Sequence, residues 1–321
     1  MLTARASLLA ALTLAVAQLP SAGSVIGTIR VSVHEDALFT ARGDTLFLVR
    51  FPEEHAKSIT VERIGPSGTR SKRLPFPLAY YLTDLSSGAH GLYLGTSVIK
   101  RFTSAPDELV RVDPVTLSVR ARARFPGSVQ TLEAGSRMWA TIGDGRVVRL
   151  DPATLRVVAA QRLLSAKSVL LHGFGLTKPA LGLGSLWTIV GGNRTELVRL
   201  DPRTLAVRSR TRLSRGASLS EVVADRTHVY LVRRGVASVD GRGRLVHIVA
   251  GASLDAAAVY KDDLVGLDDA ASALELLDAD GRVTASTRMR DLSGDLAVGG
   301  DNAWFLGDGG TGNGVVHVRL P

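Results

Sequence analysis

The stretch LVRVDPVTLSV at residues 109–119 recurs twice with few changes, as VVRLDPATLRV at residues 147–157 and as LVRLDPRTLAV at residues 197–207. Apolar residues alternate with other residues up to the aspartate, which is typical of a strand with one buried face. The Asp-Pro-x-Thr that follows predicts a type I turn, because the aspartate can bond nearby backbone and the proline presets φ. A second β-branched run predicts the return strand, so each copy is expected to be a β-hairpin.

A second pattern precedes these hairpins, and it consists of a small or polar turn followed by a short strand with a large central residue. It occurs at residues 36–40, 90–94, 136–140, 184–188, 228–232, 263–267 and 302–306. The hairpin aspartates at positions 113, 151, 201, 240 and 278 recur mostly at intervals of about 38 residues. Four-stranded units of roughly this length, repeated around a ring, are propeller blades. The sequence therefore predicts an all-β fold, a single seven-bladed β-propeller of four-stranded antiparallel blades.

The repeats also predict the blade boundaries and how the ring closes. We expect blades at residues 29–64, 78–125, 129–163, 180–213, 218–250, 252–289 and 294–320. The last blade would lack a fourth strand, and residues 22–28 are expected to supply it, because an open sheet edge must be covered. Three insertions, at residues 65–77, 97–107 and 164–179, are expected to be loops that share one face of the ring.

The segment from Leu186-Trp-Thr-Ile through the third copy resembles the repeat of YVTN-type and streptogramin-lyase-like propellers, a quinoprotein-like branch, over about residues 27–321. This resemblance implies the propeller fold, whereas function depends on sites carried by the fold. Streptogramin lyases are metal-assisted enzymes with histidine and glutamate on blade loops. Trp304-Phe305 is similar to their Trp-Phe strand, but Leu306-Gly307 follows in place of the Thr-Glu that the resemblance would require.

The N-terminus has the pattern of a secretory signal peptide. Arg5 is followed by the apolar run 8–17, which is too short to span a bilayer, and Ala15-Val16-Ala17 offers a cleavage site. We therefore expect residues 1–23 to be a signal peptide and residues 24–321 to form the propeller. The composition looks bacterial, so a secreted, extracytoplasmic protein without a later transmembrane segment is expected. The chain has no cysteine, which excludes disulfides and thiolate sites.

Positive charge is the feature that points to a partner. The formal net charge is +9, with 39 basic and 30 acidic residues. The expected basic loop face holds the candidate ligand-binding residues Arg70, Lys72, Arg73, Lys100, Arg101, Lys167, His172, Lys178, Arg233 and Arg234. For an exported chain this face predicts an anionic cell-wall polymer, lipid head groups or an acidic protein as partner, in preference to nucleic acid.

No catalytic or metal-binding motif is evident, and the sequence predicts no cofactor. There is no G-x-S-x-G elbow, H-E-x-x-H or P-loop. We therefore expect a non-enzymatic binding or scaffold protein. The alternative is a metal-assisted lyase or hydrolase of the streptogramin-lyase or lactonase kind. Its best candidates would be His34, His90 and His228, which share one type of loop, although ordinary exposed loop histidines are the favoured explanation.

Overall fold

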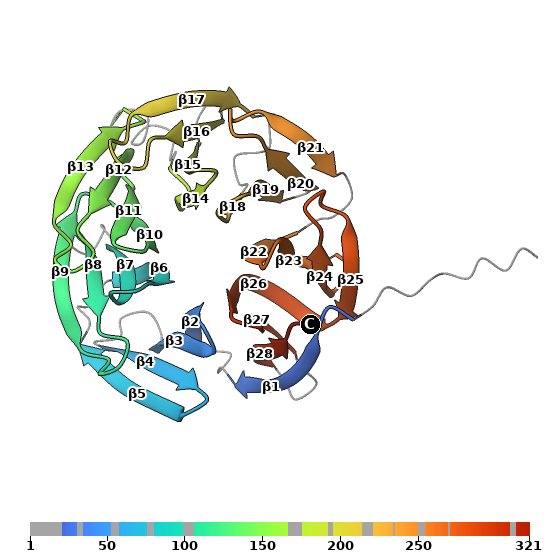
Figure 1. Cartoon of the computed structure of the whole chain (residues 1–321). Helices are drawn as coiled ribbons and strands as arrows, with labels where there is room; N and C mark the ends of the chain where they lie inside the picture. Colours follow the sequence, from blue (N-terminus) through green and yellow to red (C-terminus); the bar gives the residue numbers. More distant parts are fainter. Residues whose placement is uncertain are drawn as a thin grey trace, which may run out of the picture.

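Seven four-stranded antiparallel sheets are arranged in a closed ring, as the computed structural model shows (Figure 1). It describes residues 21–30, 35–52, 58–75, 80–98, 106–165, 175–191, 195–213, 221–233, 235–249, 254–268, 270–308 and 313–321. Residues 1–20, most of the predicted signal peptide, lie outside the described residues. The predicted fold, a seven-bladed β-propeller, is confirmed. In the described ranges no helix is long and apolar enough to cross a membrane.

Each blade is a meander whose first strand lies nearest the axis and whose fourth strand lies at the rim (Figure 1). Blade 1 contains β2 (Glu35–Arg42), β3 (Thr45–Pro52), β4 (Ser58–Gly65) and β5 (Gly68–Pro75). Blade 2 contains β6 (Tyr80–Ser87), β7 (Leu92–Val98), β8 (Asp107–Val112) and β9 (Val119–Phe125). Blade 3 contains β10 (Val129–Ala134), β11 (Arg137–Ile142), β12 (Arg146–Leu150) and β13 (Val157–Arg162).

The remaining four blades repeat this order. Blade 4 contains β14 (Ala180–Gly182), β15 (Ser185–Val190), β16 (Glu196–Leu200) and β17 (Val207–Arg212). Blade 5 contains β18 (Glu221–Ala224), β19 (Val229–Arg233), β20 (Gly235–Val239) and β21 (Leu245–Val249). Blade 6 contains β22 (Ala256–Tyr260), β23 (Asp263–Asp268), β24 (Ala273–Leu277) and β25 (Val283–Arg288). Blade 7 contains β26 (Arg290–Gly299), β27 (Asn302–Asp308), β28 (Asn313–Arg319) and β1 (Ser24–Arg30).

Blade 1 differs from the prediction by one strand. The repeat pattern at residues 36–40 was interpreted as a second strand, but it lies in β2, the first strand of the blade. The true second strand is β3, with buried Phe47 and Leu48 at its centre. The two strands are similar because both have an apolar centre and follow a polar turn. Residues 65–77, predicted to be an inter-blade loop, therefore belong largely to the fourth strand, β5.

The predicted hairpin turns are one residue longer than a type I turn. In the 147–157 repeat the Leu155 N–H donates to the Asp151 carbonyl at 2.8 Å, and the Asp151 N–H donates to the Arg156 carbonyl at 2.9 Å. The Asp151 carboxylate accepts from the backbone N–H of Ala153 and Thr154. Leu155 has a φ of 62°, which is strained for a leucine. Its side chain is buried in the core between two blades, so apolar burial offsets this strain.

Neighbouring blades are joined by side chains that reach the next blade's turn. Tyr93 Oη donates to the Pro152 carbonyl at 3.1 Å, and Trp139 Nε1 donates to the Pro202 carbonyl at 2.9 Å. Arginines one residue before the end of the third strand make a similar contact. Arg111 Nη1, for example, donates to the Ala153 carbonyl in the turn of the next blade at 2.7 Å. These hydrogen bonds fix each blade against the next around part of the ring.

The predicted closure of the ring is confirmed. The strand β1 pairs antiparallel with β28, from Ser24 opposite Arg319 to Arg30 opposite Gly314. The preceding residue Ala22 is fully buried in the core of blades 6 and 7. Ser21 Oγ and Thr287 Oγ1 lie 2.8 Å apart in a hydrogen bond. The first and last described strands thus complete one sheet (Figure 1).

Candidate functional site: a basic hairpin and a charged channel

The described members of the predicted basic face lie in two separate places. Arg70, Lys72 and Arg73 lie on β5, at the outer rim of blade 1. Lys178 lies inside the ring, where it lines the central channel. Lys100, Arg101, Lys167, His172 and Arg234 lie outside the described residues, as does the side chain of Arg233.

The rim of blade 1 carries a cluster of positive charges. We call the β4–β5 pair, with its residues Arg63, Arg70, Lys72 and Arg73, the basic hairpin. Arg63 and Arg70 are directly opposite each other in the strand register. Like charges at opposed positions destabilise a sheet. The opposed charges of this hairpin therefore lower the stability of the isolated protein.

The contacts of the basic hairpin are made with neutral groups. Arg70 Nη1 donates to the Val115 carbonyl at 3.0 Å, and Lys72 Nζ donates to Ser118 Oγ at 2.6 Å. Both acceptors belong to the turn of blade 2, so the hairpin rests against the next blade. Arg73 Nε donates to Ser58 Oγ at 2.5 Å. Among the described residues, these three basic side chains make no salt bridge with a carboxylate.

Four arginines on two other rim strands are paired with carboxylates. On β9, Arg120 lies 3.0 Å from Asp113, and Arg122 lies 3.0 Å from Glu108. On β17, Arg208 lies 2.7 Å from Asp201, and Arg210 lies 2.8 Å from Glu196. A hydrogen bond from Arg208 and the turn's backbone N–H groups hold the pKa of Asp201 well below its usual range. The basic hairpin is thus distinguished from β9 and β17 by lacking carboxylate partners among the described residues.

The central channel contains a second charged site. Its middle is a cavity of about 590 Å³ that is lined by the inner strands of blades 1, 2, 3, 5, 6 and 7 and by the segment 176–178. Lys178 Nζ lies 2.8 Å from Asp84 Oδ1. Asp84 Oδ2 accepts hydrogen bonds at 2.8 Å from both the backbone N–H and the hydroxyl of Thr131. The Asp84 carboxylate, only 5% exposed, is therefore fully engaged.

Two further carboxylates face the same cavity, those of Glu221 on β18 and Asp295 on β26. Burial raises the pKa of Glu221 to about 7, against the opposing charge of Lys178 and with a contribution from Asp295. Burial also raises the pKa of Asp295. For Lys178, burial lowers the pKa, but the charge and hydrogen bond of Asp84 outweigh this effect and the net shift is upward. Of the three carboxylates in this cavity, Asp84 is the one that forms an ion pair with Lys178 among the described residues.

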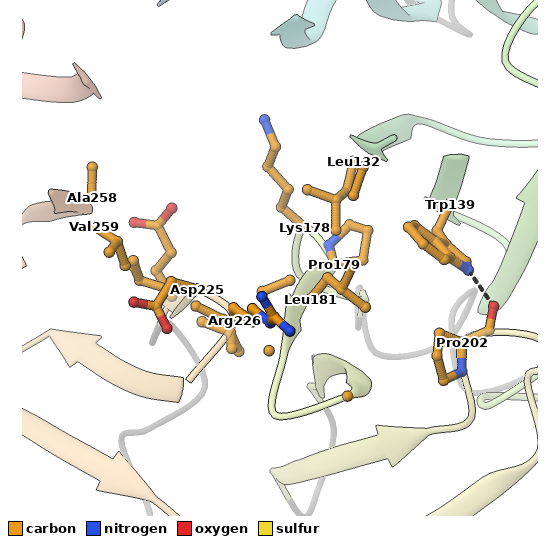
Figure 2. A pocket seen from close by; sticks show the side chains of 18 of the residues that line it. Leu132, Trp139, Lys178, Pro179, Leu181, Pro202, Asp225, Arg226, Ala258 and Val259 are labelled. Atoms are coloured by element: carbon orange, nitrogen blue, oxygen red, sulfur yellow. Dashed lines mark hydrogen bonds between the residues drawn. The ribbon is translucent and has the colours of Figure 1, made fainter. Parts of the chain in front are cut away.

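A larger cavity of about 860 Å³ adjoins the first, and both are lined by Lys178, Glu221 and Ala257. Figure 2 shows Lys178 extending into the open centre, with Leu132 on one side and Ala258 and Val259 on the other. The cavity leads toward the turns that follow the inner strands, where Arg226 lies beside Asp225 (Figure 2). It therefore has apolar walls between a charged interior and a charged mouth.

The histidines form separate local pairs. His90 Nδ1 lies 2.5 Å from Glu133 Oε1, and His228 Nδ1 lies 3.4 Å from Asp225 Oδ2 and 2.9 Å from Thr227 Oγ1. His34 lies outside the described residues. Within the described part of the chain, no three His, Cys, Asp or Glu side chains are grouped as they would be to hold a metal ion.

Sequence reasoning missed the channel site, although a signal was present. Asp84, Glu221 and Asp295 are carboxylates within or at the start of first strands, whose other members are largely small or apolar. Side chains of first strands that point inward must line the axis of a propeller. The segment 175–179 was expected to be part of a surface loop. Instead the Thr177 N–H donates to the Ile189 carbonyl of β15 at 3.0 Å, and the Gly175 carbonyl accepts from the N–H of Gly191, just beyond β15, at 2.9 Å.

Comparisons with known proteins show the fold and not a family. No family model matches the chain, and no curated protein matches its sequence. Among solved structures, BamB from Moraxella catarrhalis is similar with a TM-score of 0.60 and 13% identity, over 93% of this chain and 100% of that chain. The β-propeller domain of Cps50 (Swd1) from Myceliophteria thermophila is similar with a TM-score of 0.63 and 16% identity, over 93% and 100%. Raptor from Chaetomium thermophilum matches with a TM-score of 0.65 and 10% identity, over 94% of this chain and 29% of its own length.

Proposed function

We propose that the protein is an exported, non-enzymatic binding propeller whose basic hairpin binds an anionic polymer of the cell envelope. The observation that carries this proposal is the placement of Arg63 opposite Arg70, without a nearby carboxylate on either strand to compensate Arg70. The only acidic residue of β4 and β5 is Glu62, which pairs with Arg50 at 3.1 Å. A polyanion would relieve the repulsion that the free protein carries.

The geometry of a strand suits a linear polymer. Alternate residues of a strand point to the same side and are about 6.5–7 Å apart, so Arg70 and Lys72 form a short row of cations. This row is supported from behind by the turn of blade 2, as described above. A linear polymer bearing phosphate or carboxylate groups could contact successive members of such a row. A membrane of anionic lipids would require a broad flat face, which a rim hairpin does not supply.

The remaining parts of the proposal rest on the sequence. Export rests on the signal-peptide pattern of residues 1–23. The relationship to YVTN-type and streptogramin-lyase-like propellers rests on the sequence of the repeats. The alternative, a metal-assisted lyase or hydrolase, would need histidines and carboxylates from several blades to converge. The separate pairing of His90 with Glu133 and of His228 with Asp225 favours the binding function over this alternative.

The test is binding of long-chain polyphosphate, measured across a salt series. The variant R70Q/K72Q/R73Q removes the three cations of β5. The control R208Q/R210Q/R212Q removes the same charge from β17, a rim strand on which Arg208 and Arg210 have carboxylate partners. We expect the first variant to lose at least about tenfold in affinity at low salt and the second to lose much less. Equal losses would mean that only net charge matters. No binding of the unaltered protein at low salt would overturn the proposal. Tighter binding to anionic vesicles than to polyphosphate would show that the partner is a lipid surface and not a polymer.

A further inference from the structure

The central channel has the charge pattern of a ligand site that is independent of the basic hairpin. Asp84 is saturated by Lys178 and by two bonds from Thr131, so Lys178 compensates it directly. Glu221 and Asp295 have no hydrogen-bond or ion-pair partner within bonding distance among the described residues. Both line the cavity, and the protein environment disfavours their charged forms. A cationic group from a ligand would supply the charge that these two carboxylates lack.

The mouth of the larger cavity has the opposite polarity. Three arginines line it there: Arg137 and Arg226 in or beside the turns that follow inner strands, and Arg203 in the outer turn of blade 4. The single carboxylate among them, Asp225, is held by the N–H groups of Thr227 and His228 at 2.7 and 2.6 Å. A purely cationic ligand would be repelled at this entrance, whereas a molecule with an anionic end would be held there.

The wall between these two charged regions is apolar. Leu132, Leu181, Val222 and Val259 line the larger cavity, and Trp139 contributes to its outer part. A volume of about 860 Å³ lies within the range of roughly 300–1,000 Å³ that is usual for small-molecule sites. The combination of apolar walls and a few convergent polar groups is also usual for such sites.

We propose that the channel binds an elongated zwitterion with an apolar body, the chemistry of a short apolar peptide with free ends. The amine of the ligand contacts Glu221 and Asp295, its apolar side chains contact Leu132, Leu181 and Val259, and its carboxylate contacts the arginines of the mouth. Lys178 does not bind the ligand's carboxylate, because its ammonium group already forms an ion pair with Asp84. Binding at this site is non-covalent, so no covalent bond forms or breaks.

The test is isothermal titration calorimetry with three probes: trileucine, its N-acetyl derivative and its C-terminal amide. Acetylation removes the ammonium and should weaken binding at least about tenfold, because two carboxylates are left unpaired. Amidation should weaken it by about threefold, since the arginines of the mouth remain in contact with solvent. Equal affinities for trileucine and N-acetyl-trileucine, or no binding of any probe, would overturn the proposal. If octylamine bound as tightly as trileucine, the role of the arginines would be wrong.

A pair of variants links the effect to the site. E221Q/D295N should bind trileucine and N-acetyl-trileucine equally, because the groups that distinguish them are gone. The matched control E196Q/D280N removes the same two charges outside the channel, from β16 and from the β24–β25 turn, and should keep the difference between the probes. Retained discrimination in E221Q/D295N would place the amine elsewhere. Polyphosphate binding should be the same in both variants, which separates this test from that of the basic hairpin.

Discussion

At the scale of single residues, some contacts between blades depend on the polar atom of an aromatic side chain in the second strand, as in Tyr93 and Trp139. Tyr93 and Tyr230 occupy equivalent positions and are both buried. The Tyr93 hydroxyl donates to the Pro152 carbonyl, whereas the buried Tyr230 hydroxyl has no partner among the described residues. The neighbouring blade there has a shorter turn, closed by the Gly281 N–H bonding the Asp278 carbonyl at 2.8 Å.

Tyr93→Phe and Tyr230→Phe should therefore differ in their effect on stability. The first leaves a buried carbonyl without its donor and should lower the free energy of unfolding by about 0.5–1.5 kcal/mol. The second removes a hydroxyl that is already unpaired and should be neutral or slightly stabilising. Chemical denaturation of both variants measures the difference. Equal destabilisation would show that the bond to Pro152 contributes nothing.

Glu221 links the channel to pH. Its pKa is raised to about 7 in the folded protein and is near 4.5 when the chain unfolds, so between these values the folded state binds more protons. The stability of the protein should therefore fall as the pH rises from about 4.5 to about 7, with Lys178, Asp295 and Asp84 as the charged neighbours.

The variant Glu221→Gln removes this cost, so its thermal stability relative to the parent should improve from pH 5 to pH 8. The gain should be at most about 1 kcal/mol, because channel water screens the carboxylate. Thermal unfolding at both pH values measures it, with Glu196→Gln on β16, outside the channel, as the control. A relative stability that is the same at pH 5 and pH 8 would contradict the raised pKa.

At the scale of elements, the like charges of the basic hairpin lower the stability of blade 1. In Arg63→Glu a carboxylate replaces the cation opposite Arg70. A favourable cross-strand pair contributes about 0.2–1 kcal/mol, so the variant should be more stable than the parent. It should also bind polyphosphate more weakly, as is common when a functional charge is removed. Denaturation and binding measured on one preparation test both, and a less stable variant would refute the repulsion.

The same scale shows what sequence could and could not predict. The Asp-Pro turns and the pairing of β1 with β28 were predictable, because turn chemistry and strand alternation are local signals and an open edge needs a partner. Blade 1 was misread by one strand, because Leu38-Phe39 in β2 and Phe47-Leu48 in β3 have the same apolar character. That single shift turned Arg70 and Lys72 from strand residues into predicted loop residues. The channel charges were missed because only the ring brings Asp84, Lys178 and Glu221 together.

At the scale of the whole molecule, stability depends on the closure of blade 7. A chain that starts at Gln18 keeps Ala22 in the core, a chain that starts at Ser24 loses it, and a chain that starts at Val31 loses β1 and exposes the edge of β28. The melting temperature should fall in that order, and the shortest chain should associate in size-exclusion chromatography because a free edge recruits other strands. Equal melting temperatures for the Ser24 and Val31 chains would show that closure does not stabilise the ring.

The pairing of β1 with β28 also constrains when folding can finish. The first described strand has to wait for the last one, since residue 24 finds its partner only at residue 319. Such a long separation makes closure a late step, after blades built from neighbouring strands have formed. A chain still being synthesised would hold six blades and one unmatched strand. The native ring can therefore close only after β28 has been synthesised, and a product truncated before β28 is left with an open sheet edge in blade 7.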